Sequence, residues 1–242
     1  MTPQPLYSAL ASLSLGLAVT PITHWFACSV QEAVLRVTGS TEAAVYVYHA
    51  LVLPGVALHE LSHWVAALIL RVPTGRVSLV PVPDGNGMAR FGSVEIGRVD
   101  PLRESLVGLA PLVAGVTAVM AIVSGPLGLG QLPVAWADLA TAGRRIFAAK
   151  DAALWLYLLT AIGNTMLPSS ADRRRWTVLP PVALGAVCLA LVAGGGRVPA
   201  YAVEWASRGL SYLALALGIT AIVDLAAGGV VCLALRCFRE HR

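Results

Sequence analysis

From Leu51 to Leu70 the chain reads LVLPGVALHELSHWVAALIL. The stretch meets the requirement for a membrane-spanning helix, which needs about 20 mostly apolar residues. It nevertheless carries three ionisable groups near its centre, on His59, Glu60 and His63. Ionisable side chains at such a depth are energetically costly and are kept where they serve a function. The stretch therefore predicts a transmembrane helix that contains a functional site.

The rest of the chain shares this apolar character. Of its 242 residues, 57% are hydrophobic and 12% are charged, against about 25% charged in an ordinary soluble domain. The mean hydropathy is +0.75. These values exclude a disordered chain, a collagen-like chain and a nucleic-acid-binding domain with a basic face. We expect the lipid bilayer to be a partner of the chain and nucleic acid not to be one.

Six apolar stretches predict an all-α polytopic membrane protein with about six transmembrane helices. We see no internal repeat, and residues 1–242 are expected to form a single integral membrane domain. The six predicted spans run from about Ser8 to Val30, Ala43 to Leu70, Ser105 to Leu127, Ala152 to Leu167, Val178 to Val192 and Leu210 to Leu235.

The distribution of cations predicts how these spans are oriented. An even number of spans places both termini on one side of the membrane. The loops on that side carry eleven Lys and Arg residues, and the loops on the other side carry six. Because cytoplasmic loops are enriched in Lys and Arg, both termini are expected in the cytoplasm. The Arg-rich, Lys-poor and Ala-rich composition favours the cytoplasmic (inner) membrane of a bacterium.

The connection between the second and third spans has the pattern of a β-hairpin. Residues 77–82 and 88–96 are rich in β-branched side chains and partly alternate between polar and apolar. The turn-forming residues 83–87, Pro-Asp-Gly-Asn-Gly, lie between them. Such a turn between two β-prone runs predicts a small membrane-associated hairpin over about 77–96, near the cytoplasmic face.

The spacing of the two histidines in the second span is typical of a zinc site. On a helix, residues i and i+4 lie about 40° apart, so His59 and His63 point to the same side, one turn apart. Two neutral imidazoles in this arrangement can share one zinc ion. Glu60 lies beside the first of them, where a carboxylate can reach a zinc-bound water.

A catalytic zinc ion takes three protein ligands and leaves one position open. Asp172 follows the end of the fourth predicted span, at the same membrane level as His63. The predicted topology therefore makes Asp172 a candidate third ligand. Its alternative role is a loop carboxylate that balances the charges of Arg173–Arg175. Glu204 is a second candidate ligand, but the predicted topology places it on the opposite side of the membrane from His63.

The sequence around these residues resembles the site-2 protease family of intramembrane zinc metalloproteases. The resemblance is carried by the pattern HExxH at 59–63 and the pattern NxxxPxxxD at 164–172, and it covers about 43–176. The predicted hairpin occupies the position of a membrane-associated β region of that family. The chain differs from the family by Arg173 in place of the usual glycine, by a longer Asn-to-Pro spacing and by the absence of a PDZ-like insertion.

The resemblance implies a role for each residue of the two patterns. His59, His63 and Asp172 are implied to be zinc ligands, and Glu60 is implied to be the catalytic base. Asn164 is implied to hold the substrate or the developing oxyanion. The implied activity is hydrolysis of peptide bonds in membrane-embedded protein or peptide substrates.

One further carboxylate lies inside a predicted span. Asp224 is near the middle of the sixth span, where a carboxylate is a candidate functional group. We expect it either to lie behind the zinc ligands and support them, or to line a path for water. A hydrogen-bonded structural carboxylate is the alternative.

Two other classes of protein compete with the enzyme. A catalytically silent scaffold would keep zinc for structure or regulation, and in its simplest form it would lack the glutamate, whereas Glu60 is present. A transporter with a site at the membrane midplane would show more intramembrane carboxylates and a repeat between its halves. Asp224 alone fits that expectation. The sequence leaves the substrate and the oligomeric state open.

Overall fold

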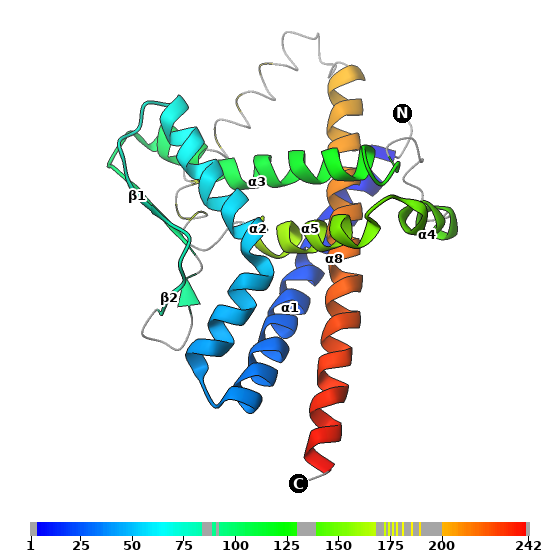
Figure 1. Ribbon diagram of the computed structural model, residues 1–242. Coiled ribbons are helices and arrows are strands. Elements are labelled where there is room, and N and C mark those ends of the chain that lie inside the picture. Colours follow the sequence, from blue (N-terminus) through cyan, green and yellow to red (C-terminus); the bar gives the residue numbers. More distant parts are fainter. Residues whose placement is uncertain are drawn as a thin grey trace.

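The computed structural model describes residues 4–83, 89–90, 92–129, 139–167 and 200–240, and the single residues 172, 174, 176, 178, 181, 185 and 189. This part of the chain is mostly helical, as predicted (Figure 1). The helices are α1 (Gln4–Thr38), α2 (Thr41–Ile69), α3 (Pro101–Ser124), α4 (Leu139–Ala148), α5 (Ala152–Thr165) and α8 (Ala200–Glu240).

The connection between α2 and α3 forms the predicted antiparallel strands. The strand pairs are β1 (Thr74–Ser78) with β4 (Ser93–Ile96) and β2 (Val82–Pro83) with β3 (Ala89–Arg90). In the first pair, Val77 lies opposite Val94. The first strand begins at Thr74, three residues before the predicted start of the hairpin. The residues 84–88, which hold most of the predicted turn, lie outside the described part of the chain.

Three of the described helices are long and apolar enough to cross a membrane: α2, α3 and the part of α8 from Val203 to Cys237. The prediction of six spans is not confirmed. The fourth predicted span corresponds to α5, whose 14 residues cover only about 21 Å, less than the roughly 30 Å of a hydrocarbon core. The first predicted span falls within α1, which is not among the three helices. The fifth, 178–192, lies almost entirely outside the described residues.

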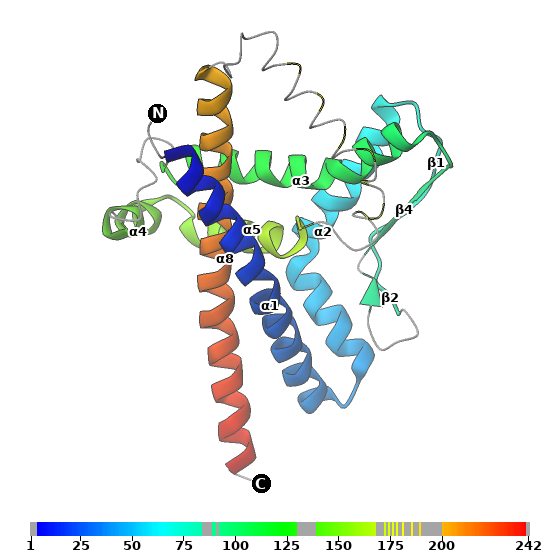
Figure 2. The same ribbon diagram turned by 180° about the vertical axis from the view of Figure 1, so that it is seen from behind.

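The helices run in two directions. α1 packs along α8, and α2 contacts α1, α3 and α5. Figures 1 and 2 show α3 and α5 running across α8. The first turns of α1 lie near the start of α8, and the chain ends at the opposite end of α8. Because no membrane plane is defined by these helices, the cytoplasmic location of both termini stays a prediction.

The main core forms where α1, α3, α5 and α8 meet, and it is built from aliphatic side chains that are almost completely buried: Val19, Val119, Val123, Leu159 and Leu217. Between membrane helices the lipid is as apolar as the side chains, so close packing supplies much of the attraction. Small residues at the contacts allow that packing.

Two glycines bring α5 close to its neighbours. A Cβ atom on Gly55 of α2 would lie 2.1 Å from the carbonyl oxygen of Ala161 and 2.3 Å from Oγ1 of Thr165. A Cβ atom on Gly163 of α5 would lie 2.0 Å from Oγ1 of Thr220 in α8. These distances are too short for a residue with a Cβ atom at position 55 or 163. α5 is therefore held tightly between α2 and α8.

Gly55→Ala is expected to destabilise the protein by about 1–3 kcal/mol, because the added methyl group clashes with the backbone of α5. The measurement is thermal unfolding in detergent micelles. Gly229→Ala is the matched control, since Gly229 lies inside α8 and a Cβ atom there meets nothing within 4 Å. In the control, alanine in place of glycine is expected to stabilise the helix by up to about 1 kcal/mol. Equal effects of the two substitutions would contradict the close approach of α2 and α5.

Candidate metal centre

α2 presents His59 and His63 on one face. The helix begins after Ser40, whose hydroxyl accepts a hydrogen bond from the amide of Ala43, and it continues without interruption to Ile69. The two imidazole ring centroids are 4.9 Å apart. His63 is buried and His59 is mostly buried. The helical spacing therefore places both rings as the sequence predicted.

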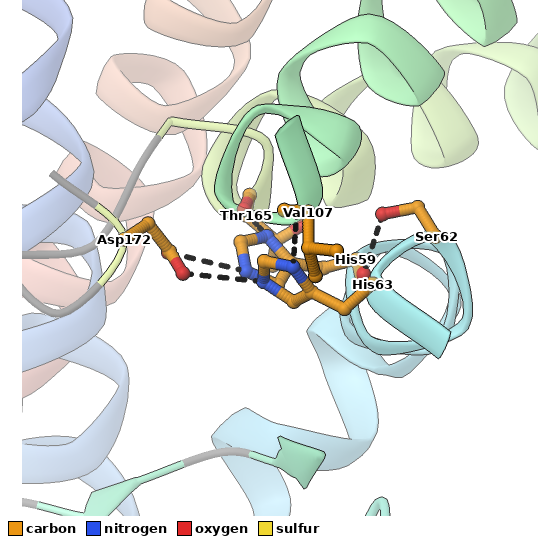
Figure 3. Close-up of polar contacts among 6 residues, drawn as sticks. All are labelled: His59, Ser62, His63, Val107, Thr165 and Asp172. Atoms are coloured by element: carbon orange, nitrogen blue, oxygen red, sulfur yellow. Dashed lines mark hydrogen bonds and ion pairs between the residues drawn. The ribbon is translucent and has the colours of Figure 1, made fainter. Parts of the chain in front are cut away.

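Each ring is held by a backbone carbonyl of another helix (Figure 3). Nδ1 of His59 lies 2.9 Å from the carbonyl oxygen of Thr165, the last residue of α5. Nδ1 of His63 lies 2.8 Å from the carbonyl oxygen of Val107 in α3. Because a carbonyl oxygen only accepts, each Nδ1 must carry the proton and donate it. In a neutral ring the other nitrogen, Nε2, then has a free lone pair for a metal ion.

Asp172 faces both Nε2 atoms. Its Oδ1 lies 3.2 Å from Nε2 of His63, and its Oδ2 lies 3.5 Å from Nε2 of His59. Figure 3 shows the carboxylate reaching towards the two rings from the side away from α2. Asp172 is only 5% exposed. The structure therefore brings together the three predicted ligands, although Asp172 follows His63 by 109 residues in the sequence.

The spacing of these atoms fits a zinc ion. At a bond length of about 2.0–2.1 Å, a tetrahedral zinc ion keeps its ligand atoms about 3.3 Å apart. The measured separations from the imidazoles to the carboxylate are 3.2 and 3.5 Å, and the ligand atoms all lie within 4.8 Å of one another. Two lone pairs and a carboxylate in a buried place repel one another unless a cation or a proton lies between them. The same donor set also suits other first-row metals such as iron(II).

Glu60 lies under the start of β4. A Cβ atom on Gly92 would come within 2.7 Å of both Cγ and Oε1 of Glu60. Gly92 is buried and precedes β4 directly. The backbone at Gly92 therefore lies against the Glu60 side chain, which would have to shift if residue 92 carried a Cβ atom. The sequence analysis did not single out Gly92, which lies inside the predicted β-prone run 88–96.

Asn164 and Asp224 contact each other. Nδ2 of Asn164 donates to the carbonyl oxygen of Thr160 at 2.9 Å and lies 3.2 Å from both carboxylate oxygens of Asp224. Oδ1 of Asn164 accepts from the hydroxyl of Tyr48 at 3.5 Å. The amide has two N–H groups, and both are engaged by these acceptors. Both N–H groups are therefore engaged within the protein, and the role of Asn164 towards a substrate stays a prediction.

Asp224 does not belong to the described metal cluster. It is fully buried, and its described hydrogen bonds are with Asn164. Tyr48 and Thr160, which complete the network, did not stand out in the sequence. Glu204, the alternative third ligand, is exposed and pairs with Arg208 at 2.6 Å within α8. The described cluster contains Asp172 and not Glu204.

No protein-family model, curated protein or solved structure matches the chain. Two imidazoles and a carboxylate can hold a metal ion, and Glu60 adds a second carboxylate one residue from His59. The two imidazoles and Asp172 can bind a metal ion, and the Glu60 carboxylate can accept a proton.

Proposed function

We propose that the chain is a zinc-dependent intramembrane endopeptidase of the site-2 protease type. The observation that carries the proposal is the convergence of His59, His63 and Asp172, with both Nδ1 atoms already bonded to carbonyls. Two of these ligands lie on α2, which is long and apolar enough to cross a membrane. Three protein ligands are typical of a catalytic zinc ion, which keeps one position open.

The residues of the site have distinct tasks in this proposal. His59, His63 and Asp172 hold the ion, and the carbonyls of Thr165 and Val107 keep the rings in the ligating tautomer. A bound zinc ion supplies Lewis acidity and makes water acidic enough to react near neutral pH. The Glu60 carboxylate accepts the proton of the attacking water and delivers it to the leaving amine.

The position of two ligands on the apolar helix α2 supports one class of substrate. A peptide bond inside a transmembrane helix is hidden by backbone hydrogen bonds, so the helix must unwind before hydrolysis. β1 and β4 form a two-stranded sheet, so each has one edge that can pair with an extended segment. Because β4 begins next to Glu60, an extended substrate segment at that edge would pass close to the base. The proposed substrates are membrane-embedded proteins or peptides, in the cytoplasmic membrane of a bacterium.

The second candidate is a catalytically silent zinc-binding scaffold or regulator. It is favoured by the fact that the two rings are anchored to α3 and α5, so that an ion would connect several segments of the fold. The two candidates differ in what Glu60 does, since a scaffold does not need a base.

The proposal is tested by reconstituting the purified protein in liposomes with a single-span fluorogenic peptide. We expect cleavage that stops when 1,10-phenanthroline removes the metal and returns when Zn²⁺ is added back. Cleavage that persists after complete removal of metal would contradict a metalloprotease. Zinc-loaded protein that cleaves no member of a panel of single-span peptides would favour the scaffold.

A further inference from the structure

The carboxyl group of Asp224 is fully buried in the part of α8 that is apolar enough to cross a membrane. Intramembrane carboxylates are costly and usually functional. The metal centre does not use Asp224 directly, because its described bonds go to Asn164. Its role therefore has to act through Asn164.

The orientation of the Asn164 amide is fixed by its neighbours. The carbonyl of Thr160 can only accept, so the nitrogen of the amide must face it. The same nitrogen donates to the carboxylate of Asp224, and the amide oxygen is left to accept from Tyr48. One side chain thus connects α5 with α8 and with α2.

A second contact holds α5 and α8 together beside this bond. Gly163, next to Asn164, packs directly against Oγ1 of Thr220, one turn before Asp224. Thr220 is fully buried, and no hydrogen-bond partner of its hydroxyl is described. The end of α5 is therefore held against α8 by close packing and by a polar contact, and the polar contact is the directional one.

The end of α5 is also where the metal centre is oriented. Asn164 and Thr165 are the last two residues of α5. The last carbonyls of a helix have no partner within the helix, so the direction of the Thr165 carbonyl depends on how the helix end is held. That carbonyl accepts from Nδ1 of His59 at 2.9 Å.

We propose that Asp224 is a positioning residue for the metal centre. By holding the amide of Asn164, it sets the end of α5 and with it the Thr165 carbonyl that orients the His59 ring. The consequence for metal binding rests on the proposed function, whereas the effect on the His59 ring does not.

The test compares Asp224→Leu, which removes the acceptor, with Asp224→Asn, which keeps one acceptor oxygen. Glu204→Leu is the matched control, because it removes an exposed carboxylate from the same helix, at a residue that does not belong to the described metal cluster. With Co²⁺ as the probe, we expect Asp224→Leu to bind about tenfold more weakly and to show a changed visible spectrum. Asp224→Asn recovers most of the affinity, and Glu204→Leu matches the wild type.

A second measurement on metal-free protein separates this inference from the proposed function. In ¹⁵N-histidine NMR spectra, we expect the Nδ1 signal of His59 to move in Asp224→Leu. The signal of His63 stays in place, because its partner is Val107 of α3. If Asp224→Leu does not fold, Asn164→Ala breaks the same bond and must shift the same signal.

The outcomes are distinct. A His59 signal that is unchanged in folded Asp224→Leu or Asn164→Ala overturns the inference, whether or not the wild type binds metal. A shifted His59 signal in a protein that binds no Co²⁺ or Zn²⁺ supports the positioning role and overturns the proposed function. Equal shifts of His59 and His63 overturn the inference as well, because they indicate a general disturbance of the fold.

Discussion

Glu60→Gln is expected to reduce peptide cleavage by about 10²–10⁴-fold while zinc binding stays at the wild-type level. The substitution keeps the size of the side chain, so its packing against the backbone of Gly92 is preserved. It removes the carboxylate that accepts the proton, but none of the three metal ligands. The measurements are the initial rate of cleavage in liposomes and the zinc content by elemental mass spectrometry.

Glu42→Gln is the matched control for this experiment. Glu42 is exposed in the first turn of the same helix, and it does not belong to the metal cluster. We expect it to cleave at the wild-type rate. If Glu60→Gln also cleaves at the wild-type rate, Glu60 is not the base and the enzyme mechanism is wrong. If Glu60→Gln loses its zinc, the loss of cleavage no longer reports on proton transfer.

Asp172→Asn is expected to lower the affinity for zinc by more than about 100-fold, the upper end of the loss seen when a residue behind a ligand is changed. The carboxylate faces both Nε2 atoms at 3.2 and 3.5 Å, so its charge acts on the ion directly. The amide keeps the shape of the side chain and removes that charge. The affinity is measured by competition with a fluorescent chelator.

Asp151→Asn is the control, since Asp151 is exposed before α5 and its side chain makes no capping hydrogen bond. Its φ of +58° is also tolerated by asparagine. We expect its zinc affinity to equal that of the wild type. An unchanged zinc affinity in Asp172→Asn would show that another residue is the third ligand. A wild-type protein that binds no zinc would contradict both candidate functions, the zinc-dependent enzyme and the zinc-binding scaffold.

The local part of the site could be predicted from the sequence. The spacing of His59 and His63 decides that both rings share one helix face, because the helical repeat is a property of neighbouring residues. Asp172 could be predicted from the expected depth of a later span, and it lies in the cluster although that span is only the short helix α5. The antiparallel strands followed from a turn signal between two β-prone runs.

The number and direction of spans could not be predicted in the same way. Hydropathy reports how apolar a segment is, not how it lies relative to its neighbours. α3 and α5 cross α8 in the structure, and α5 is too short to cross a bilayer alone. Glycines such as Gly55 and Gly163 allow helices to pack this closely. The sequence around a glycine does not indicate which other helix will pack against it.

By itself the sequence determined an apolar helical chain and a pair of histidines with a glutamate beside them. Only the tertiary structure decided which groups orient those residues. The Nδ1 partners are the carbonyls of Thr165 and Val107, and every residue has a carbonyl, so no sequence pattern could indicate them. The pairing of Asn164 with Asp224 likewise depends on how two distant helices pack, which short-range periodicity does not encode.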